Sequence, residues 1–195
     1  MTPGFFRRRF ASNNGSHPVF RGVAIMRRIA CLTIPDPGAL GIVVSFPATD
    51  ASKTTRDRFE QHALNAQCAT CHATIDNLGF AFESFDGMGE WHPDGKENGL
   101  PIHTAVSLST GSDLDGTYAS SAELLGALAR STSVKQCLAR QLFRSTAGRS
   151  DASVKDAEDG FVEVWKQLPA DQQDRLADVL VAFVKSPTFV QRRVP

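Results

Sequence analysis

The chain has 195 residues, which is enough for one hydrophobic core or for two small helical subdomains. Its 21 basic and 21 acidic residues give a formal net charge of +0, and this argues against a nucleic-acid-binding role, since such proteins normally carry a basic stripe. The composition is that of an ordinary globular protein, and we find neither an apolar run of membrane-spanning length nor an export signal of the usual form.

The N-terminal part of the chain gives weak structural signals. Residues 1–15 show no periodicity, and we expect a disordered or truncated N-terminus there. Ser16 followed by Pro18 predicts the start of a helix. Residues 35–53 are predicted to form an extended connector, whose apolar part, residues 39–46, is either a short strand or a strip packed against the core.

The middle of the chain is predicted to contain a helix, a loop and a short strand. Thr54 and Asp57 have the spacing of a capping box, which predicts a helix of about 12–15 residues that runs towards Cys68. Residues 73–91 are rich in Gly and Phe, and we expect a loop there. Apolar and polar side chains alternate over residues 102–106, as in a short strand or hairpin.

Cys68, Cys71 and His72 lie in the sequence Cys-Ala-Thr-Cys-His, which has the spacing of a c-type haem attachment site. In such a site the two cysteine sulfurs bond to the vinyl groups of one haem, and the histidine binds the iron. Cysteines three residues apart lie on one face of a helical turn, so both sulfurs can reach one macrocycle. The pattern therefore predicts one covalently attached haem c per chain, with His72 as a metal ligand.

Other uses of this cysteine pair stay open at the level of sequence. A thioredoxin-like dithiol would follow a buried strand in a βαβ unit, whereas the polar residues 56–67 precede the pair here. A zinc site would need further ligands, and His92 and His103 are available but are not spaced as a second pair. A chance match is the last alternative.

The C-terminal part shows clear helical periodicity. Helix starts are marked by three pairs with capping-box spacing: Ser120 with Glu123, Ser133 with Gln136, and Ser153 with Asp156. Apolar residues recur at helical spacing in the sets Leu124, Leu125, Leu128; Val134, Cys137, Leu138, Leu142; Phe161, Val162, Trp165; and Leu176, Val179, Leu180, Phe183, Val184. We therefore predict a mainly α fold, in which a cytochrome c-like haem-binding segment with a short strand or hairpin precedes a small C-terminal helical bundle.

Four longer phrases add a family resemblance: CATCHATIDNLGFAFESFDGMGEW (68–91), ENGLPI (97–102), CLARQLF (137–143) and SPTF (186–189). Through them the chain resembles the C-terminal portion of the large cytochrome c-like multidomain proteins first catalogued in planctomycetes and also seen in myxobacteria. The resemblance implies a haem-binding cytochrome c-like domain over residues 16–118 and a C-terminal helical domain over residues 119–195, both without an assigned reaction. It also implies that the chain is a piece of a longer exported protein, periplasmic or extracellular.

The second axial ligand of the iron is less certain from the sequence than His72. Met88 is flanked by Gly87 and Gly89, which would let the backbone approach the ring, and a thioether ligand would raise the reduction potential. Trp91 could donate its indole N–H to a haem propionate. Both side chains could instead be ordinary core residues. Alternatives to Met88 are an open sixth position or one of three histidines, His62, His92 and His103.

Cys31 and Cys137 are left over once the haem has taken its pair. In an oxidising compartment two remaining cysteines are expected to pair, so we predict a Cys31–Cys137 disulfide.

These observations favour an electron carrier over a catalyst. The first hypothesis is a mono-haem c-type module that passes single electrons to a redox partner protein or to other domains of the parent protein. One alternative is a haem enzyme, peroxidase-like or oxygen-activating, with an open distal site. Another is a non-catalytic domain that uses haem or zinc as a structural staple.

Overall fold

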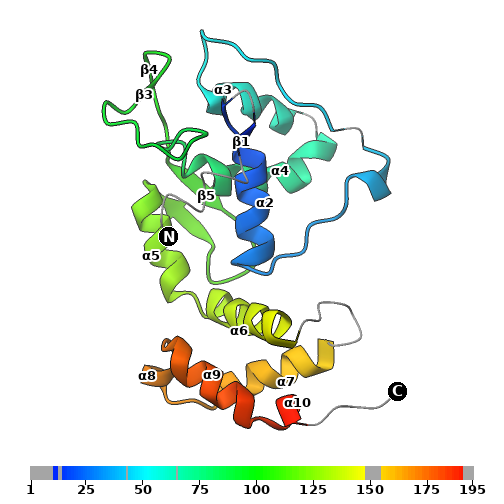
Figure 1. Cartoon of the computed structure of the whole chain (residues 1–195). Coiled ribbons are helices and arrows are strands. Elements are labelled where there is room, and N and C mark those ends of the chain that lie inside the picture. Colours follow the sequence, from blue (N-terminus) through cyan, green and yellow to red (C-terminus); the bar gives the residue numbers. More distant parts are fainter. Residues whose placement is uncertain (1–10, 13–14, 43, 65, 148–154, 191–195) are drawn as a thin grey trace. The chain divides into compact units, whose positions relative to one another are not determined.

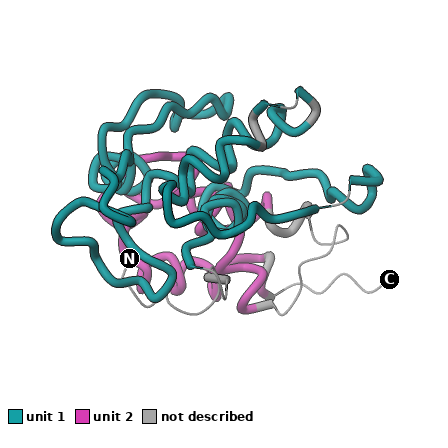
Figure 2. Tube along the Cα trace, turned by 90° about the horizontal axis from the view of Figure 1, so that it is seen from above, with its two compact units in different colours: residues 1–129 teal, residues 130–195 magenta. Residues whose placement is uncertain are grey.

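The computed structural model describes residues 11–12, 15–42, 44–64, 66–147 and 155–190 (Figure 1). These residues form a mainly helical structure with small two-stranded antiparallel sheets, which confirms the predicted fold class. The chain divides into two compact units, unit 1 over residues 1–129 and unit 2 over residues 130–195, coloured separately in Figure 2. The domain limits 16–118 and 119–195 stay a prediction, and the predicted disordered or truncated N-terminus falls mostly outside the described residues.

Unit 1 consists of short strands, helices and a long connector. Its elements in chain order are β1 (Ala11–Ser12), β2 (Gly15–Ser16), α2 (Pro18–Arg28), the 3-10 helix η1 (Gly38–Leu40), α3 (Thr55–Phe59), the 3-10 helix η2 (Glu60–Leu64), α4 (Ala66–Phe80), β3 (Lys96–Glu97), β4 (Leu100–Pro101), β5 (Val106–Leu108), β6 (Gly116–Tyr118) and α5 (Ser121–Arg130), whose last residue belongs to unit 2. The strands pair antiparallel as β1 with β2, β3 with β4, and β5 with β6.

The core of unit 1 is organised around the crossing of α2 and α4, which Figure 1 shows near the centre of the unit. A Cβ atom on Gly22 of α2 would overlap the carbonyl oxygen of Ile75, and one on Gly79 of α4 would overlap the carbonyl oxygen of Pro18. The two helix backbones therefore touch, and only glycine allows this approach. The crossing fixes α4, the helix that carries the cysteine pair, against the core.

Helix α4 is longer at its C-terminal end than the sequence analysis predicted. Residues 73–91 were expected to form a loop, but α4 continues to Phe80. The helix continues because it places Ile75 and Leu78 in the core, with 4% and 1% of their surface exposed, and Gly79 against α2. The predicted capping box of Thr54 and Asp57 is present at the start of α3, although the helix that it opens is short and passes into η2 before α4 begins.

A buried ion pair fixes the segment that follows α4. The Arg21 guanidinium of α2 donates from Nη1 to the carbonyl oxygen of Phe82 at 2.7 Å and to Glu83 Oε1 at 3.1 Å. Its Nη2 donates to Ser16 Oγ at 2.7 Å and to the carbonyl oxygen of Phe85 at 3.3 Å. The side chains of Arg21 and Glu83 are only 1% and 2% exposed. This network therefore anchors the chain immediately before the turn that carries Met88.

The connector between α2 and α3 has, in its described residues, little regular secondary structure apart from η1. Its described apolar residues form no strand, although the Phe46 ring packs edge-on against His17 and Phe20, with ring centroids 4.7 and 5.6 Å apart. The large apolar side chains there are exposed by between 41% and 60%: Leu40, Ile42, Val44 and Phe46.

Unit 2 is the predicted small helical bundle. Its elements are α6 (Thr132–Ala147), α7 (Lys155–Lys166), α8 (Ala170–Gln173), α9 (Leu176–Lys185) and α10 (Pro187–Val190). Its core is built from Ala139, Phe143, Phe161, Val162, Trp165, Val179 and Phe183.

The start and the inward face of α6 differ from the prediction. Ser131 Oγ accepts from the Val134 N–H at 3.0 Å, so the helix begins at Thr132 and Ser133 is not the capping residue. Leu138 was expected on the apolar face but is 58% exposed, while the neighbouring Ala139 is buried. Ser153, predicted to cap the next helix, lies outside the described residues.

Candidate functional site

The first two turns of α4 carry the predicted haem-binding residues. Cys68, Cys71 and His72 occupy positions i, i+3 and i+4 of this helix, so all three side chains lie on one face. Both cysteines are free thiols of intermediate burial, and the His72 side chain is 23% exposed. The three groups are thus gathered on one helix face and are accessible from outside the core.

One further residue of α4 contacts this set. Asp76 lies one turn after His72, and its Oδ1 is 2.8 Å from His72 Nδ1. Asp76 is only 4% exposed, and its second carboxylate oxygen, Oδ2, has no hydrogen-bond partner among the residues that the structure describes. The sequence analysis missed Asp76, although its i+4 spacing from His72 on a helix would have been the signal for it.

These residues fit a c-type haem. Two unpaired thiols one turn apart can form both thioether bonds, and the imidazole beside them can bind iron through Nε2, the ring nitrogen that the bond to Asp76 does not use. A histidine that ligates a metal usually donates its other ring N–H to a carboxylate or carbonyl group, and Asp76 supplies such a carboxylate. The thiols, imidazole and buried carboxylate together form a donor set that suits this cofactor.

Met88 and Trp91 lie beyond α4, on a turn. The Met88 N–H donates to Asp86 Oδ1 at 2.8 Å, and the Trp91 ring packs edge-on against Phe85 with 5.1 Å between the ring centroids. The Met88 residue is 67% exposed and Trp91 is 56% exposed, so neither is an ordinary core side chain. The partners in these two contacts, Asp86 for Met88 and Phe85 for Trp91, belong to the same short segment, residues 85–91.

The alternative histidine ligands are placed as follows. His92 is half-buried, and its backbone N–H donates to the carbonyl oxygen of Ser84 at 2.9 Å. His103 is exposed, and its carbonyl oxygen accepts from Arg56 Nη1 at 2.9 Å. The side chain of His62 lies outside the described residues.

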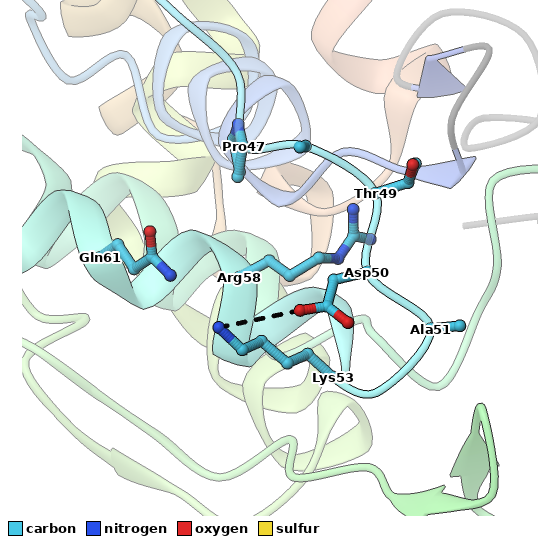
Figure 3. Close-up of a pocket in the computed structure, with 8 residues that line it drawn as sticks. Pro47, Thr49, Asp50, Ala51, Lys53, Arg58 and Gln61 are labelled. Atoms are coloured by element: carbon cyan, nitrogen blue, oxygen red, sulfur yellow. Dashed lines mark ion pairs between the residues drawn. The ribbon is translucent and has the colours of Figure 1, made fainter.

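A shallow pocket of ≈ 490 Å³ lies elsewhere in unit 1 and was not predicted (Figure 3). It is lined by residues 47–51 together with Lys53, Arg58 and Gln61. Figure 3 shows the Asp50 carboxylate between the side chains of Arg58 and Lys53, and Lys53 Nζ is 3.9 Å from Asp50 Oδ2. Because it contains none of the haem-binding residues, it is a separate surface feature.

The four cysteines fall into two classes. Cys31 and Cys137 are disulfide-bonded, which confirms the predicted bond, whereas Cys68 and Cys71 are free. The oxidised pair and the candidate haem-binding pair are therefore distinct.

Comparison with known families finds a match to the N-terminal part of the chain. The model of the family PSCyt3, described as a protein of unknown function (DUF1588), matches residues 1–95. These residues are therefore similar to the PSCyt3 family. This part of the chain includes α2, α4, the cysteine pair, and the turn with Met88 and Trp91. No curated protein and no solved structure matches the chain.

None of the described helices has the length and apolar character needed to cross a membrane.

Proposed function

We propose that the chain is a c-type haem-binding electron-transfer module of a larger exported redox protein. The observation that carries this proposal is the placement of two free thiols and one imidazole, those of Cys68, Cys71 and His72, on one face of α4. The PSCyt3 match over the same residues supports it, because the family name contains the abbreviation Cyt.

Three residues of α4 would have different roles at this site. The two cysteine sulfurs would hold one haem c covalently, and His72 would bind the iron. When bound, the haem supplies an iron that takes up and releases a single electron. The close contact between α2 and α4 would keep the cysteines and the histidine fixed during that change, since α4 cannot shift without moving the core.

Met88 and Trp91 are proposed as further cofactor contacts, Met88 as the second iron ligand and Trp91 as a donor to a propionate. Their support is accessibility, since the structure places both side chains exposed on the turn after α4. The Arg21–Glu83 ion pair anchors the chain just before this turn, so the turn has a fixed base and an exposed tip.

Export is proposed on the basis of the disulfide. Disulfides form and persist in oxidising compartments, and c-type haem is attached outside the cytoplasm, so both features point to a periplasmic or extracellular location. The electron partner would then be another domain of the parent protein or a separate redox protein.

The test is an intact-mass measurement of the full chain, fused to a signal peptide and co-expressed with a cytochrome c maturation system. The expected result is the added mass of one haem per chain, which a Cys68→Ser/Cys71→Ser variant loses. A Cys31→Ser/Cys137→Ser variant is the matched control, because it also removes two cysteines but should keep the haem. A wild-type chain of unmodified mass would contradict the proposal.

A further inference from the structure

We propose that Asp76 is a positioning residue that fixes the tautomer and orientation of the His72 ring and thereby lowers the reduction potential of the site. This inference rests on the proposed function, in which His72 binds the haem iron. Nothing in the family match assigns a role to Asp76.

The geometry of the pair comes from one helix. His72 and Asp76 are four residues apart on α4, so their side chains meet one above the other without any loop having to move. The Nδ1–Oδ1 distance of 2.8 Å is in the range of hydrogen bonds that involve an ionised group. The helix therefore holds the imidazole by a short bond to its Nδ1 atom.

The burial of the pair is asymmetric. The Asp76 side chain is 6% exposed and the His72 side chain 23%, so the carboxylate lies in the protein and the imidazole reaches towards the surface. Asp76 Oδ2 has no hydrogen-bond partner among the described residues, so the bond at Oδ1 is the only one that the structure shows for this carboxylate. A carboxylate oxygen accepts hydrogen bonds and an imidazole N–H donates them, so the 2.8 Å contact fits a hydrogen on His72 Nδ1. The lone pair is then on Nε2, where an iron ligand needs it.

A comparison within the same unit shows that this is not an ordinary surface pair. Arg56 and Glu60 have the same i+4 spacing and the same 2.8 Å separation, but the Glu60 side chain is 52% exposed. Water can satisfy both oxygens of such a carboxylate, whereas burial leaves Asp76 Oδ2 without a visible partner. A buried polar atom of this kind calls for an explanation, and orientation of a metal ligand supplies one.

The consequence for the iron follows from charge. An imidazole that donates to a carboxylate is a more basic ligand, and it stabilises ferric iron more than ferrous iron. Asp76 should therefore lower the reduction potential relative to a site without this carboxylate. If the preference for the ferric state changes tenfold, the potential of a one-electron couple shifts by about 59 mV.

The first test is the reduction potential of the haem-loaded full chain in wild type and in Asp76→Asn. The variant keeps the shape of the side chain and removes its charge, so haem attachment should persist and the potential should rise by about 59 mV or more, the tenfold change. Asp76→Glu restores the charge and should bring the potential back towards the wild-type value. Asp171→Asn, at an exposed carboxylate in α8, is the control for loss of one negative charge. If the potential of Asp76→Asn equals that of Asp171→Asn, the inference is wrong.

The second test needs no haem and separates this inference from the proposed function. Nitrogen-15 NMR of histidine-labelled apoprotein, recorded where the imidazole carries a single hydrogen, should show that hydrogen on His72 Nδ1. In Asp76→Ala, which removes the acceptor, the hydrogen should move to Nε2. A wild-type apoprotein with the hydrogen on Nε2 would overturn the inference, whether or not haem is bound. A wild-type chain that never takes up haem would overturn the proposed function, while the NMR result would still decide the role of Asp76.

Discussion

The Arg21 guanidinium of α2 lies 3.1 Å from the Glu83 carboxylate, and both side chains are almost wholly buried. Burial raises the pKa of Glu83 to about 7, although Arg21 and the Ser16 hydroxyl act in the opposite direction. The network joins α2 to the segment after α4. It is therefore the place where pH should affect the stability of unit 1.

The stability of unit 1 should decrease as the pH rises from 4.5 towards and through about 7. The folded-state pKa of Glu83 is above its ordinary value, so the folded state binds the extra proton, and its contribution is complete at low pH and lost above about 7. The loss has an upper bound of about 3 kcal/mol. Denaturant unfolding followed by circular dichroism at several pH values measures it.

Glu83→Gln provides the control for this pH dependence. Glutamine can still accept from Arg21, but it does not titrate, so the slope between pH 4.5 and about 7 should disappear. Because wild-type Glu83 is mostly protonated below about 7, the neutral glutamine should keep the free energy of unfolding close to the low-pH value of wild type across this range. An unchanged slope in the variant would assign the pH dependence to other groups.

Gly22→Ala should destabilise unit 1 by about 1–3 kcal/mol, the usual cost of overpacking a core. Alanine is the better helix former, but its Cβ would overlap the Ile75 carbonyl oxygen, so α2 and α4 would have to separate. The control is Gly38→Ala in η1, where an added Cβ would meet only Asp36 Oδ1 at 3.4 Å. Equal unfolding midpoints for the two variants would mean that the crossing tolerates a side chain.

The extent of α4 shows what sequence patterns can and cannot predict. Gly79 and the phenylalanines around it are typical of a loop, yet the helix continues because Gly79 is needed for contact with Pro18 of α2. A long-range contact of this kind leaves no local signal. The role of Asp76 is hidden for a related reason, because the composition of residues 73–91 predicts a loop and i+4 spacing has meaning only on a helix.

The C-terminal helices were predictable because their apolar residues recur at helical spacing. Several of these residues form the core of unit 2, whereas Leu176 and Val184 are 55% and 47% exposed. Phe161 and Phe183, for example, were both predicted to face inwards, and their ring centroids are 4.8 Å apart. The cysteine–histidine motif could also be recognised in the sequence, since its residues are close together along the chain. The surroundings of Met88 were not, because a turn after a helix has no periodicity to analyse.

Thiol counting under denaturing conditions should separate the two classes of cysteine. The unreduced apoprotein should give two reactive thiols, those of Cys68 and Cys71, and reduction should add those of Cys31 and Cys137. The haem-loaded protein should give none before reduction, because both thiols have become thioethers. Four reactive thiols in unreduced protein from an oxidising compartment would contradict the disulfide.

Met88→Leu tests the proposed second iron ligand. If the thioether binds the iron, its loss should lower the reduction potential, remove the absorption band of the iron–sulfur bond, and let added imidazole bind more tightly. Because Met88 is 67% exposed, the substitution should leave the unfolding midpoint of the apoprotein unchanged. Wild-type spectra in the variant would assign the sixth position to another group or leave it open.

The most direct test of the account is a pyridine haemochrome spectrum of the full chain, exported and co-expressed with a cytochrome c maturation system, before and after acid–acetone extraction. We predict a c-type spectrum in wild type that survives extraction, because Cys68 and Cys71 hold the haem by two thioether bonds. We also predict that the substitution His72→Ala changes or abolishes the absorption spectrum of the haem iron. A colourless wild-type protein, or one whose haem is removed completely by the extraction, would contradict the haem-binding role of α4.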